Sequence, residues 1–242
     1  MAVVGDAHLG SANPGDETAF HDFLTALPDL ATSLVIVGDL FDFWFEYRSV
    51  IPRRPFRTLT RLAALVERGI PVAMFGGNHD RWGGSFWSRD LGIPFYPGGA
   101  ELTLAGHRAW VTHGDGVSDV KLGARVLHRL LASRATTAVF GALHPTWGFA
   151  LADALSGTLG ETNRSGAAAQ AAALAQEAWA RALLERRGEL ALVVAGHTHL
   201  RALVEHAPRR WYLNAGQWMG DREYAIVTDA GVSLEVWPAG SR

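Results

Sequence analysis

The sequence of 242 residues predicts an α/β fold, and three observations support that prediction. In the N-terminal half, short runs rich in valine and isoleucine alternate with helical apolar patterns, at a spacing that indicates βαβ units and a mainly parallel sheet. Residues 117–187 show no strand signal and favour helix throughout. After Leu200, four strand-like segments follow at hairpin spacing and predict an antiparallel portion of sheet. We therefore expect a core formed by residues 1–116 and 188–242, with residues 117–187 as a helical insertion.

Buried strands are predicted where a short apolar run ends in a turn of small residues. Three such runs occur early in the chain, at residues 1–4, 34–37 and 71–75. Residues 16–30 and 56–68 lie between them and repeat apolar side chains at helical spacing. We expect the first helix to close at Pro28 and the second to end at Gly69.

The remaining strands are shorter or follow the insertion. Short strands are predicted around residues 101–104 and 107–112, and a further buried strand over residues 189–194. The four segments near the end of the chain cover residues 202–205, 210–214, 223–228 and 232–236. Within the insertion, the alanine-rich run of residues 167–182 predicts a packed helix, and the whole segment has room for three or four helices.

Composition excludes several classes of protein and of site. A net charge of −2 does not favour nucleic-acid binding, which requires a surplus of positive charge. The absence of cysteine excludes disulfides and thiolate metal sites, so any metal must be held by His, Asp, Glu or Asn. Neither a secretory signal nor an apolar run of about 20 residues is visible. We expect a soluble, cytoplasmic protein.

Side chains that bind metals follow the predicted strands, where open α/β sheets place their active sites. Glycine stands beside them in each turn and allows a sharp bend or a close approach. Five of the ten histidines lie in these turns. If the chain stays extended past Gly196, His197 and His199 share one face. The candidate ligands are Asp6, His8, Asp39, Asn78, His113, His197 and His199.

This donor set predicts two cations rather than one. Two aspartates, one asparagine and four histidines exceed a tetrahedral zinc site and suit a pair of open-sited ions roughly 3.5–4 Å apart. Mixed imidazole and carboxylate donors favour Mn²⁺, Zn²⁺ or Fe²⁺ over Ca²⁺. Such a pair lowers the pKa of bound water and clamps the oxygens of an in-line phosphoryl displacement. We expect His79 to stabilise a phosphate oxygen or protonate the leaving group, oriented by a hydrogen bond to Asp80.

The complete set of motifs resembles the signature of calcineurin-like metallophosphoesterases, in the same order. These motifs are Gly5-Asp-x-His8, Gly38-Asp39, Gly77-Asn-His-Asp80, His113-Gly-Asp115 and Gly196-His-Thr-His199. The resemblance implies a four-layer α-β-β-α sandwich with a helical cap insertion, and attack on phosphorus by a metal-bridging hydroxide without a covalent enzyme intermediate. It also implies that Asn78, His79 and Asp80 are catalytic, and that Mn²⁺ is the first expectation for both cations, with Zn²⁺ and Fe²⁺ as alternatives. By this resemblance Asp6, His8, Asp39 and His199 bind one metal, and Asp39 as a bridge, Asn78, His113 and His197 bind the other.

A narrower resemblance concerns the substrate. Residues 38–47, 77–82 and 143–145 resemble the UDP-2,3-diacylglucosamine diphosphatase branch, which cleaves a UDP-linked diacyl sugar to UMP and lipid X during lipid A synthesis. The resemblance implies a nucleotide-linked glycolipid substrate, no protein partner, and peripheral contact with the inner face of the cytoplasmic membrane. Residues 135–152 carry no charged side chain and are a candidate acyl-facing or interfacial surface. Candidate substrate contacts are Trp44, Arg81, Asn163 and Arg164.

Two departures from this branch leave the substrate open. Residues 156–165 have almost none of the basic side chains that the branch carries there, and Gln217 replaces the aspartate of its Gly-Asp-Trp. Neither change touches a candidate ligand, so hydrolysis is expected to survive. The alternatives are a soluble nucleotide phosphodiesterase or phosphatase of the same superfamily, and a non-catalytic scaffold of this fold. A scaffold normally loses ligands, whereas this chain keeps them all.

Overall fold

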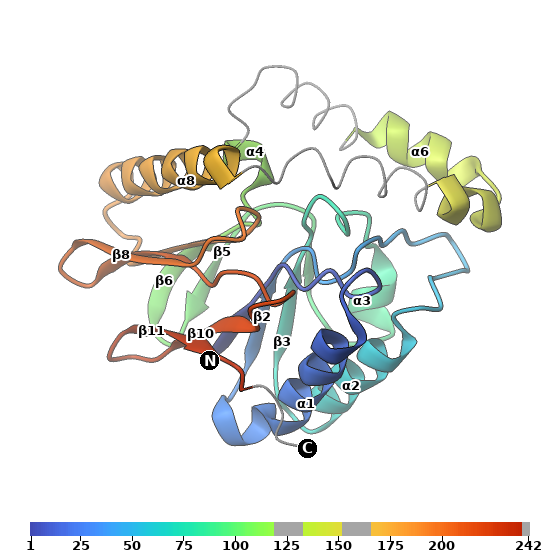
Figure 1. Cartoon of the computed structure of the whole chain (residues 1–242), viewed down its shortest axis with the longest axis horizontal. Helices are drawn as coiled ribbons and strands as arrows, with labels where there is room; N and C mark the ends of the chain where they lie inside the picture. Colours follow the sequence, from blue (N-terminus) through green and yellow to red (C-terminus); the bar gives the residue numbers. More distant parts are fainter. Residues whose placement is uncertain (119–132, 152–165, 239–242) are drawn as a thin grey trace.

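The computed structural model describes residues 1–118, 133–151 and 166–238. Two sheets pack face to face, and helices cover both outer faces (Figure 1). Valines from both sheets, among them Val35, Val37, Val111 and Val194, fill the layer between them. This arrangement confirms the expected four-layer α-β-β-α sandwich.

The first sheet has the strand order β11-β10-β1-β2-β3-β4, and its strands β1 to β4 are parallel. The strands are β1 (Ala2–Val4), β2 (Leu34–Val37), β3 (Val72–Phe75), β4 (Phe95–Tyr96), β10 (Glu223–Val227) and β11 (Val232–Val236). The outer face is covered by α1 (Pro14–Leu30), α2 (Phe56–Glu67) and α3 (Ser85–Arg89). Sequence periodicity predicted β1, β2, β3, α1 and α2, but not the short elements β4 and α3.

Helix α1 continues past the position where we expected it to stop. Its N-cap residue Asn13 accepts a hydrogen bond from the Asp16 amide at 3.0 Å, and the helix ends at Leu30, not at Pro28. A proline in the last turn removes one backbone hydrogen bond, which is a small loss near a helix end. Burial of Phe20, Phe23, Leu24 and Leu27 holds the helix on the sheet.

The second sheet has the order β5-β6-β7-β9-β8, with β6, β7 and β9 parallel. The strands are β5 (Ala100–Leu104), β6 (His107–Val111), β7 (Leu192–Ala195), β8 (Ala202–Ala207) and β9 (Arg210–Asn214). We expected the last four strands to form one antiparallel portion of sheet, but they divide between the two sheets. Strands β8 and β9 complete this sheet, whereas β10 and β11 return to the first sheet, where β10 pairs with β1.

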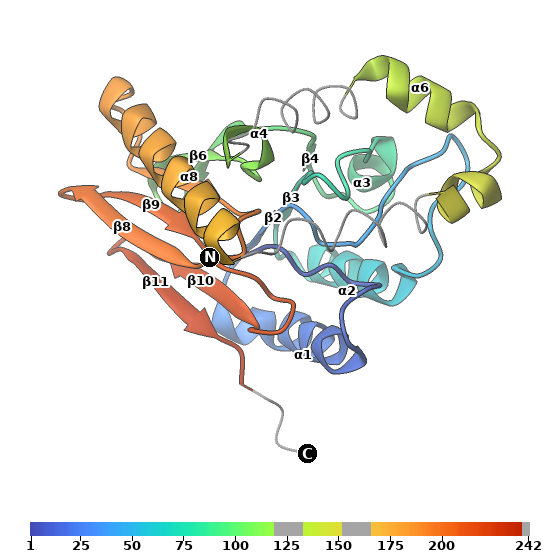
Figure 2. The same cartoon turned by 45° about the horizontal axis from the view of Figure 1, so that its top comes forward.

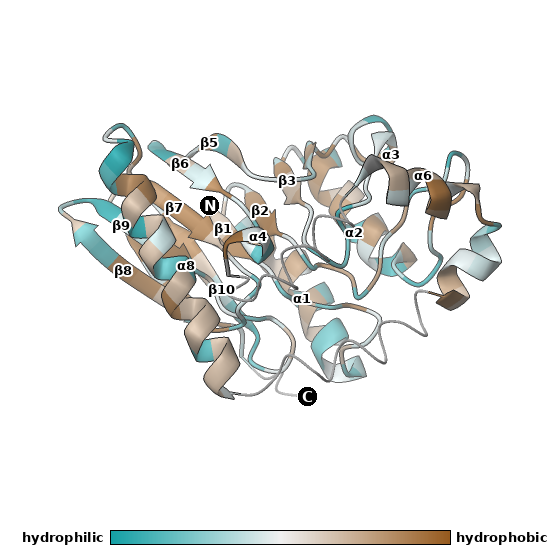
Figure 3. Cartoon of the chain, turned by 90° about the horizontal axis from the view of Figure 1, so that it is seen from above, coloured by the Kyte–Doolittle hydropathy of each residue, from teal (hydrophilic) through white to brown (hydrophobic). Residues whose placement is uncertain are grey.

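The described part of the predicted insertion divides between two ends of the molecule. Helix α8 (Gly166–Arg186) packs Ala180 and Leu184 on β7 and β9 and forms the outer layer of the second sheet. Helix α6 (Arg134–Ala142) and the helical residues 145–151 lie at the opposite end (Figures 2 and 3). A short helix, α4 (Asp115–Ser118), follows β6. The division of the chain at residues 117 and 187 stays a prediction. Among the helices that the structure describes, none has the length and apolarity needed to cross a membrane.

Candidate metal centre

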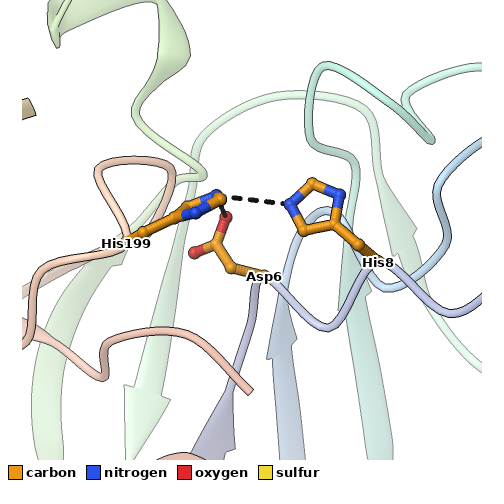
Figure 4. A group of neighbouring side chains, drawn as sticks. All are labelled: Asp6, His8 and His199. Carbon is orange, nitrogen blue, oxygen red and sulfur yellow. Dashed lines mark hydrogen bonds and ion pairs between the residues drawn. The ribbon is translucent and has the colours of Figure 1, made fainter. Parts of the chain in front are cut away.

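The turns that carry the seven candidate ligands leave the carboxyl ends of β1, β2, β3, β6 and β7 and meet above the two sheets. One group contains Asp6, His8 and His199, whose ligand atoms all lie within 4.8 Å of one another. His199 Nε2 is 3.4 Å from Asp6 Oδ1 and 3.3 Å from His8 Nε2 (Figure 4). A carboxylate oxygen and two imidazole nitrogens therefore face a common point.

A second group adjoins the first and contains Asp39, His113 and His197. Asp39 Oδ2 is 3.1 Å from His113 Nε2 and 3.9 Å from His8 Nε2, so this oxygen lies between the two groups. Asn78 Oδ1 is 3.3 Å from His113 Nε2. The other ring nitrogen of His113 donates a 2.8 Å hydrogen bond to the Val37 carbonyl, which turns Nε2 toward Asp39. The structure thus brings all seven side chains together, with Asp39 shared.

The backbone of these turns is left-handed, not extended. The φ angles are 49° at Asp6, 45° at His8, 48° at Asp39, 71° at His197 and 59° at His199. The expectation of an extended chain past Gly196 is therefore wrong, because β7 ends at Ala195 and the turn sends His197 and His199 to different groups. Strained backbone of this kind, repeated at five of seven candidate ligands, is typical of functional sites.

At two positions, side-chain atoms of neighbouring turns approach the backbone so closely that only glycine fits. A Cβ at Gly77 would lie 2.2 Å from Asp39 Oδ1, and a Cβ at Gly38 would lie 2.6 Å from His113 Nδ1. No real Cβ tolerates such distances, so these turns need glycine. At these two positions the glycine beside a candidate ligand thus has a steric cause.

The electrostatics of the centre fit a bound cation. Burial alone would raise the pKa of Asp39, but His113 and His79 hold the pKa of that carboxyl well below its usual range. Burial lowers the pKa of His8 and of His197 to about 4, so both rings are neutral, the form that binds metal. Asp6 Oδ1 is buried and accepts no hydrogen bond from the described residues. A buried carboxylate oxygen without a donor, facing imidazole nitrogens, suits a divalent ion.

His79 is oriented by Asp42 and not, as we expected, by Asp80. His79 Nδ1 lies 2.7 Å from the Asp42 carbonyl oxygen and 3.9 Å from Asp42 Oδ1. Its ring stands edge-on to His8, with 4.8 Å between the ring centroids. Asp42 was not among the predicted site residues, although it lies only three residues after Asp39 in the same turn.

The carboxylate of Asp80 instead accepts hydrogen bonds from backbone amides. It accepts hydrogen bonds from four amides, those of Asp39, Leu40, Phe41 and Gly77, at 2.7–3.3 Å. Burial and the nearby Asp39 charge raise the pKa of Asp80 to about 6. Asp80 therefore links the turn after β2 to the turn after β3 and fixes both.

The structure does not bring the four predicted substrate contacts together as it does the candidate ligands. Trp44 is wrong as a contact, because its side chain is fully buried and packs on Phe41 and Trp87 in the core. Arg81 forms an ion pair with Asp115 beside the centre. Asn163 and Arg164, like the whole of residues 152–165, lie outside the described residues.

A buried polar network supports the turn that carries His197 and His199. Gln176 and Asn214 are both fully buried, and their amide nitrogens each lie 3.1 Å from the Gly196 carbonyl. Asn214 Nδ2 also donates to Thr198 Oγ1 at 3.0 Å, and Gln176 Oε1 accepts from Tyr212 at 2.7 Å. No pattern in the alanine-rich run around Gln176 pointed to this role.

Comparison with known proteins agrees with this geometry. Residues 1–201 match the family described as calcineurin-like phosphoesterase. Over 95% of its length the chain is 28% identical to UDP-2,3-diacylglucosamine hydrolase of Porphyromonas gingivalis, of which 94% is covered. It is also 28% identical to the protein of that name from Ralstonia nicotianae, with 87% of this chain and 81% of the relative covered.

Among solved structures, a dimetal phosphatase from Danio rerio superposes with a TM-score of 0.50 at 11% identity, over 98% of both chains, which supports the fold. The family match covers most of the chain, and the His and Asp groups at its centre can hold the divalent metal ions that this family uses. The chain therefore belongs to the calcineurin-like phosphoesterase family and is a metal-dependent hydrolase.

Proposed function

We propose that this protein hydrolyses the pyrophosphate bond of UDP-2,3-diacylglucosamine and releases UMP and lipid X, a step of lipid A biosynthesis. The observation that carries the proposal is the similarity to the Porphyromonas gingivalis hydrolase, because it extends over 95% of the chain and so includes the insertion. A relative that shared only the metal-binding motifs would support a phosphoesterase without indicating its substrate.

The centre would hold two divalent cations, Mn²⁺ in the first place, with Zn²⁺ and Fe²⁺ as alternatives. One cation would take Asp6, His8, Asp39 and His199 as ligands, and the other Asp39, Asn78, His113 and His197. When bound, such a pair supplies an activated water at neutral pH and withdraws charge from the phosphoryl oxygens. The sharing of Asp39 between two groups supports the pair, because a bridging carboxylate holds two ions close together.

His79 is the side chain of this centre that we assign to the phosphate or to the leaving oxygen. The Asp42 carbonyl can accept only from a protonated Nδ1, so this contact orients the ring and leaves Nε2 for the substrate. Part of the His79 side chain, 28%, remains exposed, as contact with a substrate requires. Asp80 acts one step further away, because its four backbone hydrogen bonds hold the turns that carry Asp39 and His79.

The lipid end of the substrate would lie toward α6. Phe43 contacts Phe140 and Phe149 of the insertion, and Phe45 contacts Phe140. Trp82 joins this cluster through its contacts with Phe43 and Phe45. This aromatic cluster offers acyl chains an apolar contact next to His79.

Peripheral contact with the inner face of the cytoplasmic membrane is the second part of the lipid proposal. Val139 is 69% exposed and Trp147 75% exposed, on a stretch from residue 135 to 151 without a charged side chain. Exposed apolar side chains of this kind, with a tryptophan among them, suit a membrane interface. No protein partner is needed for this function.

Substrate profiling tests the proposal. The metal-loaded protein should cleave UDP-2,3-diacylglucosamine at least about tenfold faster, in kcat/KM, than the same molecule without acyl chains, since each buried acyl segment contributes binding energy. Asp39→Asn should abolish cleavage of both compounds and of bis-p-nitrophenyl phosphate. Equal rates with and without acyl chains would instead favour a soluble nucleotide phosphodiesterase. Absence of any hydrolysis by the metal-loaded protein would favour the scaffold alternative.

A further inference from the structure

A groove adjoins the metal centre on the side of α8. It has a volume of about 320 Å³ and lies between α8, the turn after β7 and the start of β10. His199, a candidate metal ligand, is one of its lining residues. The volume is at the lower end of the range of about 300–1,000 Å³ for small-molecule sites, so the groove suits one part of a larger ligand.

The charges of this groove exclude a phosphate as its occupant. Three carboxylates line it, those of Glu177, Asp221 and Glu223, against the single cation Arg201. Arg201 Nε is 3.2 Å from Glu223 Oε1 and is thereby partly neutralised. A phosphate group here would meet uncompensated negative charge.

The groove is also too polar for an acyl chain, but it offers two apolar contacts. Leu174 is 58% exposed and Leu200 36% exposed, and both line it. Glu177 is half-buried and lines the groove, and the structure shows no hydrogen bond or ion pair for it among the described residues. An unpaired acceptor next to two exposed leucines suits an uncharged ring that carries N–H and hydroxyl donors.

The opposite side of the metal centre has different chemistry. Phe43, Trp82 and Phe140 form an aromatic cluster there, beside α6. Helices α6 and α8 lie at opposite ends of the molecule (Figure 3). The centre therefore has an apolar side and a polar, acidic side, as a substrate with a lipid at one end and a nucleoside at the other requires.

We propose that this groove binds the nucleoside of the substrate, and the inference rests on the proposed function. Glu177 would accept hydrogen bonds from the ribose hydroxyls or from the N–H of the base, and Leu174 and Leu200 would pack on the base. The scissile bond then lies at the metal centre, UMP leaves on the side of α8, and the lipid phosphate leaves on the side of α6. The groove determines which end of the substrate faces which side.

The test measures binding to the metal-loaded protein by isothermal titration calorimetry, with UMP and with inorganic phosphate. In Glu177→Gln the Kd for UMP should rise about tenfold, the loss expected for one hydrogen bond to a charged group. In Leu174→Ala the Kd for UMP should also rise, because the base loses an apolar contact. The Kd for phosphate should change by less than about twofold, because phosphate reaches only the metals. Glu185→Gln is the matched control, because its side chain is 63% exposed on the same helix and does not line the groove.

Steady-state kinetics supply a second readout. KM for UDP-2,3-diacylglucosamine should rise in Glu177→Gln while its kcat stays within about twofold, since an interaction with the remote nucleoside contributes equally to substrate and transition state. An unchanged Kd for UMP, or an equal rise for UMP and phosphate, would overturn the inference. The proposed function fails separately, if the unmodified protein binds UMP through the groove but does not cleave the diacylated substrate.

Discussion

Gln176 Nε2 in α8 lies 3.1 Å from the carbonyl oxygen of Gly196, the first residue of the turn that carries His197 and His199. A Cβ at Gly114 would lie only 2.1 Å from the same nitrogen, so Gln176 also packs against the turn that carries His113. The only fully buried polar side chain of α8 therefore contacts two of the turns that form the metal centre.

Replacing Gln176 by leucine should reduce both stability and metal binding. The change removes the acceptor of the buried Tyr212 hydroxyl, at a cost of about 1–3 kcal/mol for that unsatisfied group. The Gly196 carbonyl loses one of its two side-chain donors and keeps Asn214. Urea denaturation of the metal-free protein measures the loss of unfolding free energy, and titration with Mn²⁺ measures the affinity. Arg181→Leu, at a site 65% exposed on the same helix, should change stability by no more than about 0.5 kcal/mol. Equal effects of the two substitutions would refute a special role for Gln176.

The two groups of ligands should respond differently to loss of a carboxylate. Asp6→Asn should remove about one equivalent of bound metal, because Asp6 belongs to the first group alone, whereas Asp39→Asn should remove both. Activity on bis-p-nitrophenyl phosphate should fall by more than the roughly 10–100-fold seen for residues that only orient ligands. Metal content after desalting, determined by mass spectrometry, checks the stoichiometry. Asp22→Asn, exposed on α1, serves as the control, and identical metal content in both test variants would argue against a shared Asp39.

Asp80→Asn should destabilise the fold although it is nearly isosteric. Each carboxylate oxygen accepts from two amides, so an amide side chain must turn its NH₂ group toward two backbone N–H donors. The expected loss is at least about 1–3 kcal/mol, with a fall in activity because both turns shift. Thermal and urea unfolding measure this loss against Asp90→Asn, which changes an exposed carboxylate at the C-terminal end of α3. A variant as stable as its parent would show that Asp80 does not hold these turns.

Acid should weaken the contact between α1 and α2 through His21. Burial lowers the pKa of His21, and its Nε2 lies 2.9 Å from Thr58 Oγ1. A depressed histidine pKa means that the unfolded chain binds the proton more readily. The contribution of His21 to stability is therefore complete above the unfolded pKa of about 6.5 and declines as the pH falls below it.

His21→Gln isolates this contribution. Urea denaturation from pH 7.5 to pH 5 gives the unfolding free energy of the parent and of the variant. As the pH falls, the unfolding free energy of the parent should decrease relative to that of the variant. The histidines of the metal centre are present in both proteins and cancel from the difference. A difference in unfolding free energy that does not change with pH would contradict the lowered pKa of His21.

Much of the fold and of the candidate site follows from local sequence. The strands β1, β2, β3 and β7 and the turns after them were predictable, because each couples a short apolar run to a glycine and a metal-type side chain. The regularity of these turns is a consequence of steric need at positions such as Gly77, where any side chain would collide with Asp39. Local chemistry and local geometry coincide there, so the sequence alone was informative.

Other features could not be derived in that way. Trp44 looked like a ligand contact because it stands in an aromatic loop, yet the loop turns it into the core against Trp87. Strand β10 pairs with β1, which lies more than two hundred residues earlier in the chain. The sequence of β10 does not indicate which strand it pairs with. Periodicity reports which face of an element is buried but not what it is buried against.

The sequence by itself therefore determined the fold class, most of the elements and the identity of the seven candidate ligands. Only the tertiary structure decided that His197 and His199 face different groups, that Asp42 holds His79, and that Gln176 supports the turn from a distant helix. The physical reason is the sequence separation of the interacting residues. Apolar spacing and glycine placement act between neighbours in the chain, whereas these contacts join residues that meet only after both sheets have paired and packed.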